Sequence, residues 1–498
     1  MSFNSWQFLI FLPIVIIVYY LIPNCFRRAW LLFASYYFYM SWNPWLIFLI
    51  MGTTLVSYLS AILIEKTDSK KLKKLYLILT LIICLGVLVF FKYFNFLSQS
   101  VIDFLNLFSL NLDTFALDLI LPVGISFYTF QTLSYSIDVY RGKISAEKHL
   151  GYYALFVSYF PQLVAGPIER PDNLIPQLRA EHKASYDNIL AGSKILLSGF
   201  FRKVVIADFC GIFVNNVYYN LASSNSLAVF IASGLFLLEI YFDFSGYSEI
   251  AIGSARIMGV KLSCNFDRPF QSQTYSEFFR RWHITLNLWF KDYLYIPLGG
   301  NRKGKVRKIF NLWIVFLLCG LWHGASWTYV LWGAYAAFFI TIESLLHKPF
   351  TAFCSQHNID LEKPHIRMIR SLVMFLIYSF SAILFRSTDM NMAILGYTRL
   401  FTGFGGSFFS NAFIQLGLTV ENIVQLVACL TAMALLYHFA YDKKFSLPSD
   451  FSKLSSQEKT SFFASNVSVF AFGIIAIAVC WLFLLGTDAS SSFAYFQF

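Results

Sequence analysis

The chain has 498 residues, a length that suggests about three soluble domains, but its composition excludes that architecture. Hydrophobic residues make up 57% of the sequence and charged residues only 13%. Typical soluble domains hold about 25% charged residues, so the charges here are too few to coat a water-facing surface. The 38 Lys and Arg residues exceed the 27 Asp and Glu residues, for a net charge of +11. In a polytopic membrane protein this excess reflects basic cytoplasmic loops, and no basic domain is present that would bind nucleic acid.

The chain begins with apolar segments long enough to cross a bilayer. No Lys or Arg precedes Arg27, so the basic region of a cleavable signal peptide is missing and residues 6–23 are predicted to remain as the first span. Residues 29–64 carry no charge, and this stretch exceeds the ~20 residues that one span needs. We expect Asn43-Pro44 to divide it into two helices.

Further apolar segments follow along the chain. Charge-free runs cover residues 75–91, 209–238, 309–342, 422–441 and 460–487. Weaker candidates lie near 117–139, 150–165, 189–207 and 369–385, and residues 161–171 contain three prolines that predict a re-entrant or loop-like segment. Together they predict an all-α polytopic integral membrane protein with about 11 or 12 spans in the lipid bilayer, plus re-entrant and amphipathic helices.

The distribution of Lys and Arg predicts the orientation of these spans, because short cytoplasmic loops are enriched in both. Cations follow the first span, the third span and the span near residue 130: Arg27, Arg28, Lys66, Lys70, Lys71, Lys73, Lys74, Arg141, Lys143 and Lys148. The loops around 42–44 and 92–116 hold only Lys92 between them, and residues 487–498 hold no cation. We therefore expect both termini outside, which requires an even number of crossings and favours the higher count.

The polar connections are too short for a folded soluble domain, so one helical membrane unit is expected. The eight cysteines are scattered and form no CxxC motif. This pattern is typical of small buried hydrophobic side chains and does not predict a metal site.

One histidine lies inside the apolar run 309–342. Burial of an ionisable group in a membrane span costs free energy, so such a residue indicates a function or a specific partner. Residues 319–325 read Cys-Gly-Leu-Trp-His-Gly-Ala, which places His323 at mid-membrane depth. Gly320 and Gly324 are four residues apart, and on one helix face they would admit a neighbouring helix or a ligand. His323 is either a functional group or a neutral histidine hydrogen-bonded to another helix.

A second polar stretch covers residues 274–293. Its aromatic and aliphatic side chains recur at helical spacing and predict an amphipathic helix at an interface or along a cavity: Phe278, Trp282, Leu286, Trp289 and Tyr293. His283 is adjacent to this stripe, beside Arg280 and Arg281. A catalytic role and simple packing are both open for His283.

Two further polar segments flank this stretch. Asn301, Arg302 and Lys303 follow two glycines in a basic loop, which would hold the phosphates of a cytosolic nucleotide-like donor or serve as an ordinary cytoplasmic anchor. Upstream, Asp243 and Glu249 lie at the end of an apolar run, where a carboxylate would orient a histidine, hold a helix break or cap a helix.

Four of these segments, in this order and spacing, resemble the membrane-bound O-acyltransferase (MBOAT) superfamily. They are Tyr-Phe-Asp-Phe-Ser-Gly-Tyr-Ser at 241–248, Arg-Arg-Trp-His at 280–283, Asp-Tyr-Leu-Tyr-Ile-Pro-Leu-Gly-Gly-Asn-Arg at 292–302 and Gly-Leu-Trp-His-Gly at 320–324. The resemblance is to the bacterial branch that acylates alginate, peptidoglycan and teichoic acid. It implies a helical bundle around a central funnel, with a membrane core over residues 1–400. Residues 401–498 are then expected to be C-terminal transmembrane helices ending in an outward-facing aromatic tail.

The resemblance also implies the chemistry. His323 matches the key histidine of the family and His283 its second polar position. An acyl thioester, acetyl-CoA, would enter from the cytoplasm as a substrate, and no tightly bound cofactor is expected. His323 would act as general base on an acceptor hydroxyl. His283, or Asn287 or Asp243 as weaker candidates, would stabilise the oxyanion or orient the reacting groups, and Arg280, Arg281, Asn301, Arg302 and Lys303 are the candidates for donor binding.

The acceptor implied by the resemblance is an extracellular or cell-wall polysaccharide of a bacterium, with the protein in the inner membrane. Tyr495 in the tail is a candidate acyl relay to an extracytoplasmic SGNH-type hydrolase-like partner, or an interfacial aromatic anchor. Two other functions are weighed beside the enzyme. An intramembrane histidine also serves as proton relay in a transporter, and the tail would suit a scaffold that recruits envelope enzymes.

Overall fold

The computed structural model describes residues 1–404, 408–425 and 427, and these residues contain helices and connecting loops but no β-strand. The first part comprises α1 (Trp6–Leu21), α2 (Asn24–Met40), the 3-10 helix η1 (Pro44–Leu46), α3 (Ile47–Lys66), α4 (Lys70–Leu88), the π-helix η2 (Val89–Tyr93), α5 (Phe94–Asn106) and α6 (Ile125–Tyr140). The middle part comprises α7 (Leu150–Ser158), α8 (Phe160–Leu163), α9 (Pro171–Arg179), α10 (Tyr186–Phe200), the π-helix η3 (Phe201–Ala207), α11 (Asp208–Tyr218), α12 (Ser226–Ile257) and η4 (Pro269–Gln271). The last part comprises α13 (Tyr275–Arg281), α14 (Ile284–Phe290), the π-helix η5 (Lys291–Tyr295), α15 (Gly304–His323), α16 (Trp327–Gln356), α17 (Pro364–Arg386), α18 (Met390–Thr402) and α19 (Phe408–Leu416).

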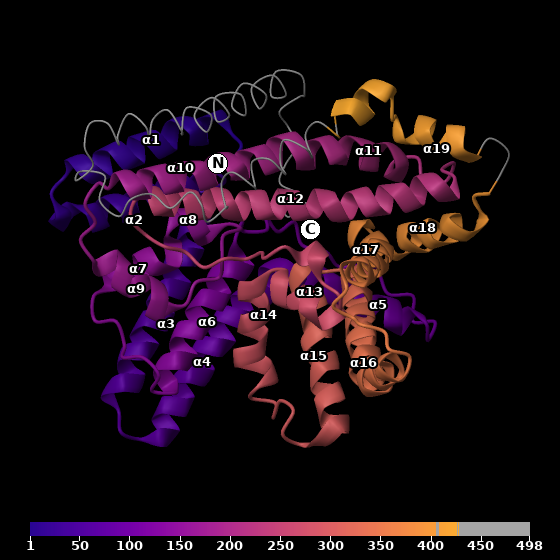
Figure 1. Ribbon diagram of the computed structural model, residues 1–498. Helices are drawn as coiled ribbons and strands as arrows, with labels where there is room; N and C mark the ends of the chain where they lie inside the picture. Colours follow the sequence, from indigo (N-terminus) through magenta and orange to yellow (C-terminus); the bar gives the residue numbers. More distant parts are fainter. Residues whose placement is uncertain (405–407, 426, 428–498) are drawn as a thin grey trace, which may run out of the picture.

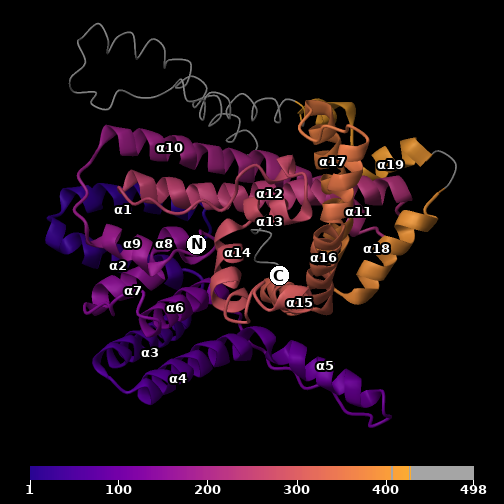
Figure 2. The ribbon, with the colours of Figure 1, turned by 60° about the horizontal axis from the view of Figure 1, so that its bottom comes forward.

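The long helix α12 organises the bundle. It runs beside α10 and α11 across the upper side of Figure 1, while α3, α4, α6 and α15 extend below it. Glycines permit the close contact between α10 and α12, because a Cβ at Gly199 would lie 2.6 Å from the carbonyl oxygen of Gly246, and one at Gly246 would lie 2.7 Å from that of Gly199. Figure 2 shows α13 and α14 enclosed between α12 and the α15–α16 pair.

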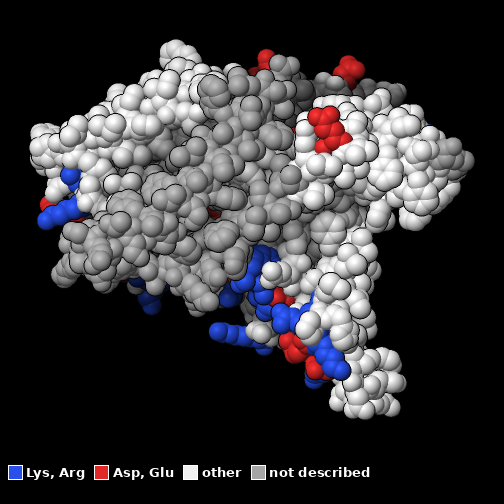
Figure 3. Space-filling view, turned by 45° about the horizontal axis from the view of Figure 1, so that its top comes forward, with Lys and Arg blue, Asp and Glu red and all other residues white. Residues whose placement is uncertain are grey.

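Six helical segments among the described residues are long and apolar enough to cross a membrane: Pro44–Lys66, Lys70–Asn106, Ser226–Ile257, Gly304–His323, Trp327–Gln356 and Pro364–Arg386. The predicted all-helical polytopic fold is confirmed. The total number of spans stays a prediction, because residues 460–487 and most of 422–441 lie outside the described residues. Figure 3 agrees with a membrane location, since broad areas of the described surface in view are uncharged and most of the Lys and Arg gather on its lower side.

Several predicted boundaries are confirmed. The stretch 29–64 divides near Asn43, whose side chain accepts a hydrogen bond from the backbone N–H of Trp45 at the start of η1. Residues 161–171 do not continue as a regular helix, because α8 ends at Leu163 and the chain resumes as α9 at Pro171. Most of this stretch is buried.

Three predicted continuous segments are wrong, because polar or left-handed residues interrupt them. The run 209–238 is divided between α11 and α12, and the side chain of Asn225 caps the start of α12. The run 309–342 is divided between α15 and α16, with Ser326 as the cap of α16. The amphipathic stretch 274–293 is broken at His283, whose backbone φ of 45° is left-handed.

Candidate active site

His323 is the last residue of α15, at the bend between α15 and α16. The following Gly324 has an extended backbone, so Gly320 and Gly324 do not lie on one helix face as predicted. Both glycines instead make room for Tyr329 of α16: a Cβ at Gly320 would lie 2.2 Å from the carbonyl oxygen of Tyr329, and one at Gly324 would lie 2.2 Å from its ring. The bend therefore turns His323 out of the middle of a helix and places it at a helix end.

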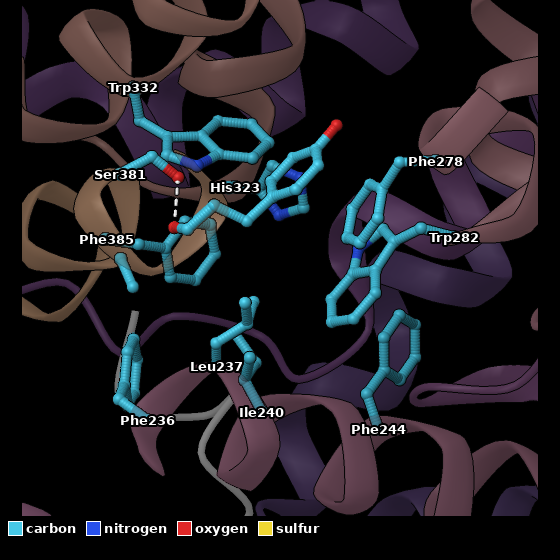
Figure 4. A pocket seen from close by; sticks show the side chains of 12 residues that line it. Phe236, Leu237, Ile240, Phe244, Phe278, Trp282, His323, Trp332, Ser381 and Phe385 are labelled. Carbon is cyan, nitrogen blue, oxygen red and sulfur yellow. Dashed lines mark hydrogen bonds between the residues drawn. The ribbon is translucent and has the colours of Figure 1, made fainter. Parts of the chain in front are cut away.

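The imidazole of His323 lines an apolar pocket (Figure 4). The pocket is formed by side chains from α12, α13, α16 and α17 and by Trp282: Phe236, Leu237, Ile240, Phe244, Phe278, Trp332, Tyr378, Ser381, Ala382 and Phe385. The His323 ring centroid lies 5.3 Å from those of Trp332 and Phe385. His323 is 6% exposed, so its ring is enclosed by these groups and still borders open space.

His283 lies beside this pocket in the bend between α13 and α14. Its ring centroid is 6.4 Å from that of His323 and 4.7 Å from that of Phe244. His283 is 1% exposed, and neither of its ring nitrogens has a hydrogen-bond partner among the described residues. It lies outside the candidate spans, and burial lowers its pKa to about 3, so the ring is neutral near pH 7. Buried polar atoms of this kind are normally satisfied by water or a ligand.

Asn287 holds the bend that carries His283. Its amide group donates to the backbone carbonyls of Phe279, Trp282 and His283, at 2.8, 2.6 and 3.2 Å. Because these bonds occupy the amide hydrogens of Asn287, they favour a role in orienting His283 over a role in stabilising an oxyanion.

Asp243 lies inside α12 and does not cap a helix. Its Oδ1 is 2.6 Å from Nζ of Lys203 in η3, and both side chains are 2% exposed. Lys203 also lies 2.8 Å from Asp208. The ion pair between Asp243 and Lys203 ties α12 to η3.

The five donor-binding candidates lie in two places. Arg280 and Arg281 end α13, two or three residues before His283, and Arg281 pairs with Glu277 at 2.8 Å. The other three, Asn301, Arg302 and Lys303, are exposed before the start of α15. Because α15 has 20 residues, these three are separated from His323 by a helix about 30 Å long.

The sequence predicts that Lys92 lies in an outward-facing loop, and the loop part of this prediction is wrong, whereas the side of the membrane stays a prediction. It lies in η2 within the candidate span Lys70–Asn106, and its Nζ donates to the carbonyl of Trp322 at 2.6 Å. In the sequence, one feature indicates a special role for Lys92: it is a single cation directly after the apolar run 75–91. Periodicity alone does not indicate which helix such a cation contacts.

No group of three or more His, Cys, Asp and Glu side chains that would bind a metal is found in the described part of the chain. The fold and the site define a polytopic helical membrane protein in which the imidazole of His323 lines an apolar pocket and that of His283 lies close to it. Comparison with known proteins extends this description: the membrane-bound O-acyltransferase family, MBOAT, matches residues 144–387, a range that includes both histidines.

The chain is also similar to curated proteins. It is 37% identical over 405 residues to a probable alginate O-acetylase AlgI of Pseudomonas syringae, covering 81% of this chain and 75% of that protein. It is 34% identical to a peptidoglycan O-acetyltransferase of Helicobacter pylori, covering 79% of this chain and 78% of that protein. A teichoic acid D-alanyltransferase of Bacillus subtilis is 29% identical over 46% of this chain and 61% of its own length. The chain belongs to the membrane-bound O-acyltransferase family, and it is a membrane acyltransferase.

Proposed function

We propose that this protein transfers an acetyl or similar short acyl group from a cytoplasmic thioester, acetyl-CoA, for O-acylation of an extracytoplasmic polysaccharide. The names of the relatives support an acetyl group and a glycan acceptor, since alginate and peptidoglycan both offer sugar hydroxyls. The apolar pocket beside His323 suits a short acyl chain.

The observation that carries the proposal is the imidazole of His323 in the lining of this pocket, with the ring centroid of His283 6.4 Å from its own. Neutral His323 accepts the proton of the acceptor hydroxyl while the hydroxyl oxygen attacks the thioester carbonyl. The carbon–sulfur bond then breaks, and His323 returns the proton to the leaving thiolate. His283, with no polar partner among the described residues, donates a hydrogen bond to the developing oxyanion.

The proposed membrane is the bacterial inner membrane, with both termini outside. Two basic connections, between α3 and α4 and before α15, lie at the same lower end of Figure 1. Their common position supports a cytoplasmic location by the positive-inside rule. Arg302 and Lys303 then contact the anionic part of the donor, and Asn301, Arg280 and Arg281 remain further candidates for this contact.

On the outer side, an SGNH-type hydrolase-like partner completes the transfer to the polysaccharide. Tyr495 relays the acyl group to it, and residues 401–498 form the C-terminal transmembrane helices and tail beyond the core of residues 1–400. Tyr495 lies outside the described residues. The relay therefore rests on the aromatic character of residues 493–498 and on the outward-facing tail that the resemblance implies.

The test is release of free coenzyme A thiol from acetyl-CoA by the purified protein in lipid vesicles. His323→Ala is expected to reduce the rate by about 10²–10⁴-fold, because it removes the general base. His365→Ala is the matched control, since this histidine is exposed at the start of α17 and is expected to leave the rate unchanged.

Thermal unfolding of each variant establishes that it remains folded. A folded His323→Ala protein with wild-type thiol release would contradict the proposal. Solute flux into the vesicles without any thiol release would instead favour a transporter.

A further inference from the structure

The end of α15 has an unusual set of hydrogen-bond partners. The last four carbonyls of a helix lack partners within the helix and need donors from elsewhere. In α15 the carbonyl of Gly320 accepts from the backbone N–H of Gly324 at 3.4 Å. The next three carbonyls, those of Leu321, Trp322 and His323, accept from side chains of η2.

Two neighbouring residues of η2 supply these donors. Nζ of Lys92 donates to the carbonyl of Trp322 at 2.6 Å and to that of His323 at 3.3 Å, and the hydroxyl of Tyr93 donates to that of Leu321 at 3.0 Å. Lys92 also donates to Oγ of Ser126 on α6 at 3.3 Å. Its ammonium group thus joins three elements at the point where the His323 backbone ends the helix.

The charge of Lys92 fits this position and is costly elsewhere in the span. A cation at a helix C-terminus is stabilised by the helix dipole and by the unpaired carbonyls. The same cation elsewhere in a membrane-spanning segment is energetically costly, so an apolar side chain would be more favourable if packing alone were required. The Lys92 ammonium lies 5.8 Å from the Trp322 ring centroid, and that ring in turn contacts both His283 and His323.

We propose that Lys92 is a positioning residue for the acyl transfer: it holds the end of α15 so that the His323 imidazole faces the pocket beside His283. The inference rests on the proposed function. Lys92 does not line the pocket and acts through the carbonyls of Trp322 and His323. A displacement of the base by about 1 Å is enough to reduce a rate about 100-fold.

The experiment compares Lys92→Met, Lys92→Arg and the control Lys70→Met by thiol release, with kcat and the KM for acetyl-CoA measured separately. Lys92→Met removes the ammonium but keeps an unbranched apolar chain, whereas Lys92→Arg keeps a cation with several donors. Lys70 is exposed at the start of the same helical segment, so Lys70→Met removes an equal charge far from the C-terminal end of α15. We expect Lys92→Met to lower kcat about 10–100-fold with KM changed less than about threefold. Lys92→Arg should recover most of kcat, and Lys70→Met should match the wild type.

A purely structural role makes a different prediction. Loss of kcat only in proportion to the unfolded fraction, measured by thermal unfolding, would overturn the inference, and so would a wild-type kcat in folded Lys92→Met. The result for His323→Ala separates the two proposals. If His323→Ala is inactive and Lys92→Met is fully active, only the role of Lys92 fails. If His323→Ala retains thiol release, the proposed general base itself fails.

Discussion

The two histidines of the candidate site are held in different ways. His323 ends a helix, and its orientation depends on the hydrogen bonds that the Lys92 side chain donates to backbone carbonyls at this helix end. His283 has a left-handed backbone, a conformation that costs about 1–3 kcal/mol for a residue other than glycine and persists only where the surroundings enforce it. Asn287 provides that enforcement, because its amide bonds to the carbonyl of His283 and to two carbonyls before it.

Asn287→Ala is therefore expected to destabilise the protein by about 1–3 kcal/mol, since it leaves the carbonyls of Phe279, Trp282 and His283 without this donor. Thiol release should fall as well, because the bend no longer fixes His283. Leu288→Ala at the neighbouring, 44% exposed position is the control and should change stability by less than about 0.5 kcal/mol. Equal thermal midpoints for the two variants in detergent would exclude this role for Asn287.

At the level of elements, the α15–α16 pair determines the shape of the pocket. The two helices approach closely at small residues, since a Cβ at Gly320 would lie 2.2 Å from the Tyr329 carbonyl oxygen and one at Gly333 would lie 2.2 Å from that of Phe316. Backbone atoms cannot yield as a flexible side chain does. The pocket side chains Trp332 and His323 therefore depend on glycine at this crossing.

We expect Gly320→Ala to force α15 and α16 apart and to lower stability by about 1–3 kcal/mol through overpacking, with a loss of thiol release. Gly86→Ala is a matched control within α4, where no atom lies within 4 Å of the added Cβ. It should leave stability unchanged or raise it by up to about 1 kcal/mol, because alanine restricts the unfolded chain. A Gly320→Ala protein with the thermal midpoint of Gly86→Ala would show that the crossing tolerates the methyl group.

The elements also show where sequence reasoning succeeds and where it ends. Apolar runs predict helices, and the Asn43-Pro44 break follows from proline geometry. The sequence does not predict the break after His323, because residues 309–342 carry no charge and hydropathy registers neither the cap at Ser326 nor the close packing at Gly324.

The site was predicted only in part, for a related reason. His283 and His323 are visible as polar residues in costly surroundings, and the structure places their rings near each other. Two partners of Lys92, the carbonyls of Trp322 and His323, are more than 200 residues away in the chain, and a single sequence contains no local signal for such a contact.

For the whole molecule, α15 connects two chemically distinct ends. Its first residue follows an exposed basic loop, and its last residue is His323 at the apolar pocket. The α3 helix runs in the opposite direction, because it ends at a basic connection where α15 begins at one. The N-terminal end of α3 lies a few residues after Ser41, whose hydroxyl accepts a hydrogen bond from the N-terminal ammonium at 2.5 Å. The C-terminal end of α3 leads into the basic connection to α4. The N-terminus and the two basic connections therefore lie at opposite ends of candidate spans.

This arrangement predicts the accessibility of single cysteines introduced at Ser41, Ser69 and Asn301, all of them exposed, in a background with the eight native cysteines replaced. A membrane-impermeant maleimide should label Ser41→Cys in intact cells, because the positive-inside rule places the N-terminal end outside. Ser69→Cys and Asn301→Cys should react only after the membrane is permeabilised. Labelling of permeabilised cells is also the control that each introduced thiol is reactive. Labelling of Ser69→Cys but not Ser41→Cys in intact cells would reverse the orientation. The basic loop before α15 would then face away from the cytoplasmic thioester, and Arg302 and Lys303 could not contact the donor.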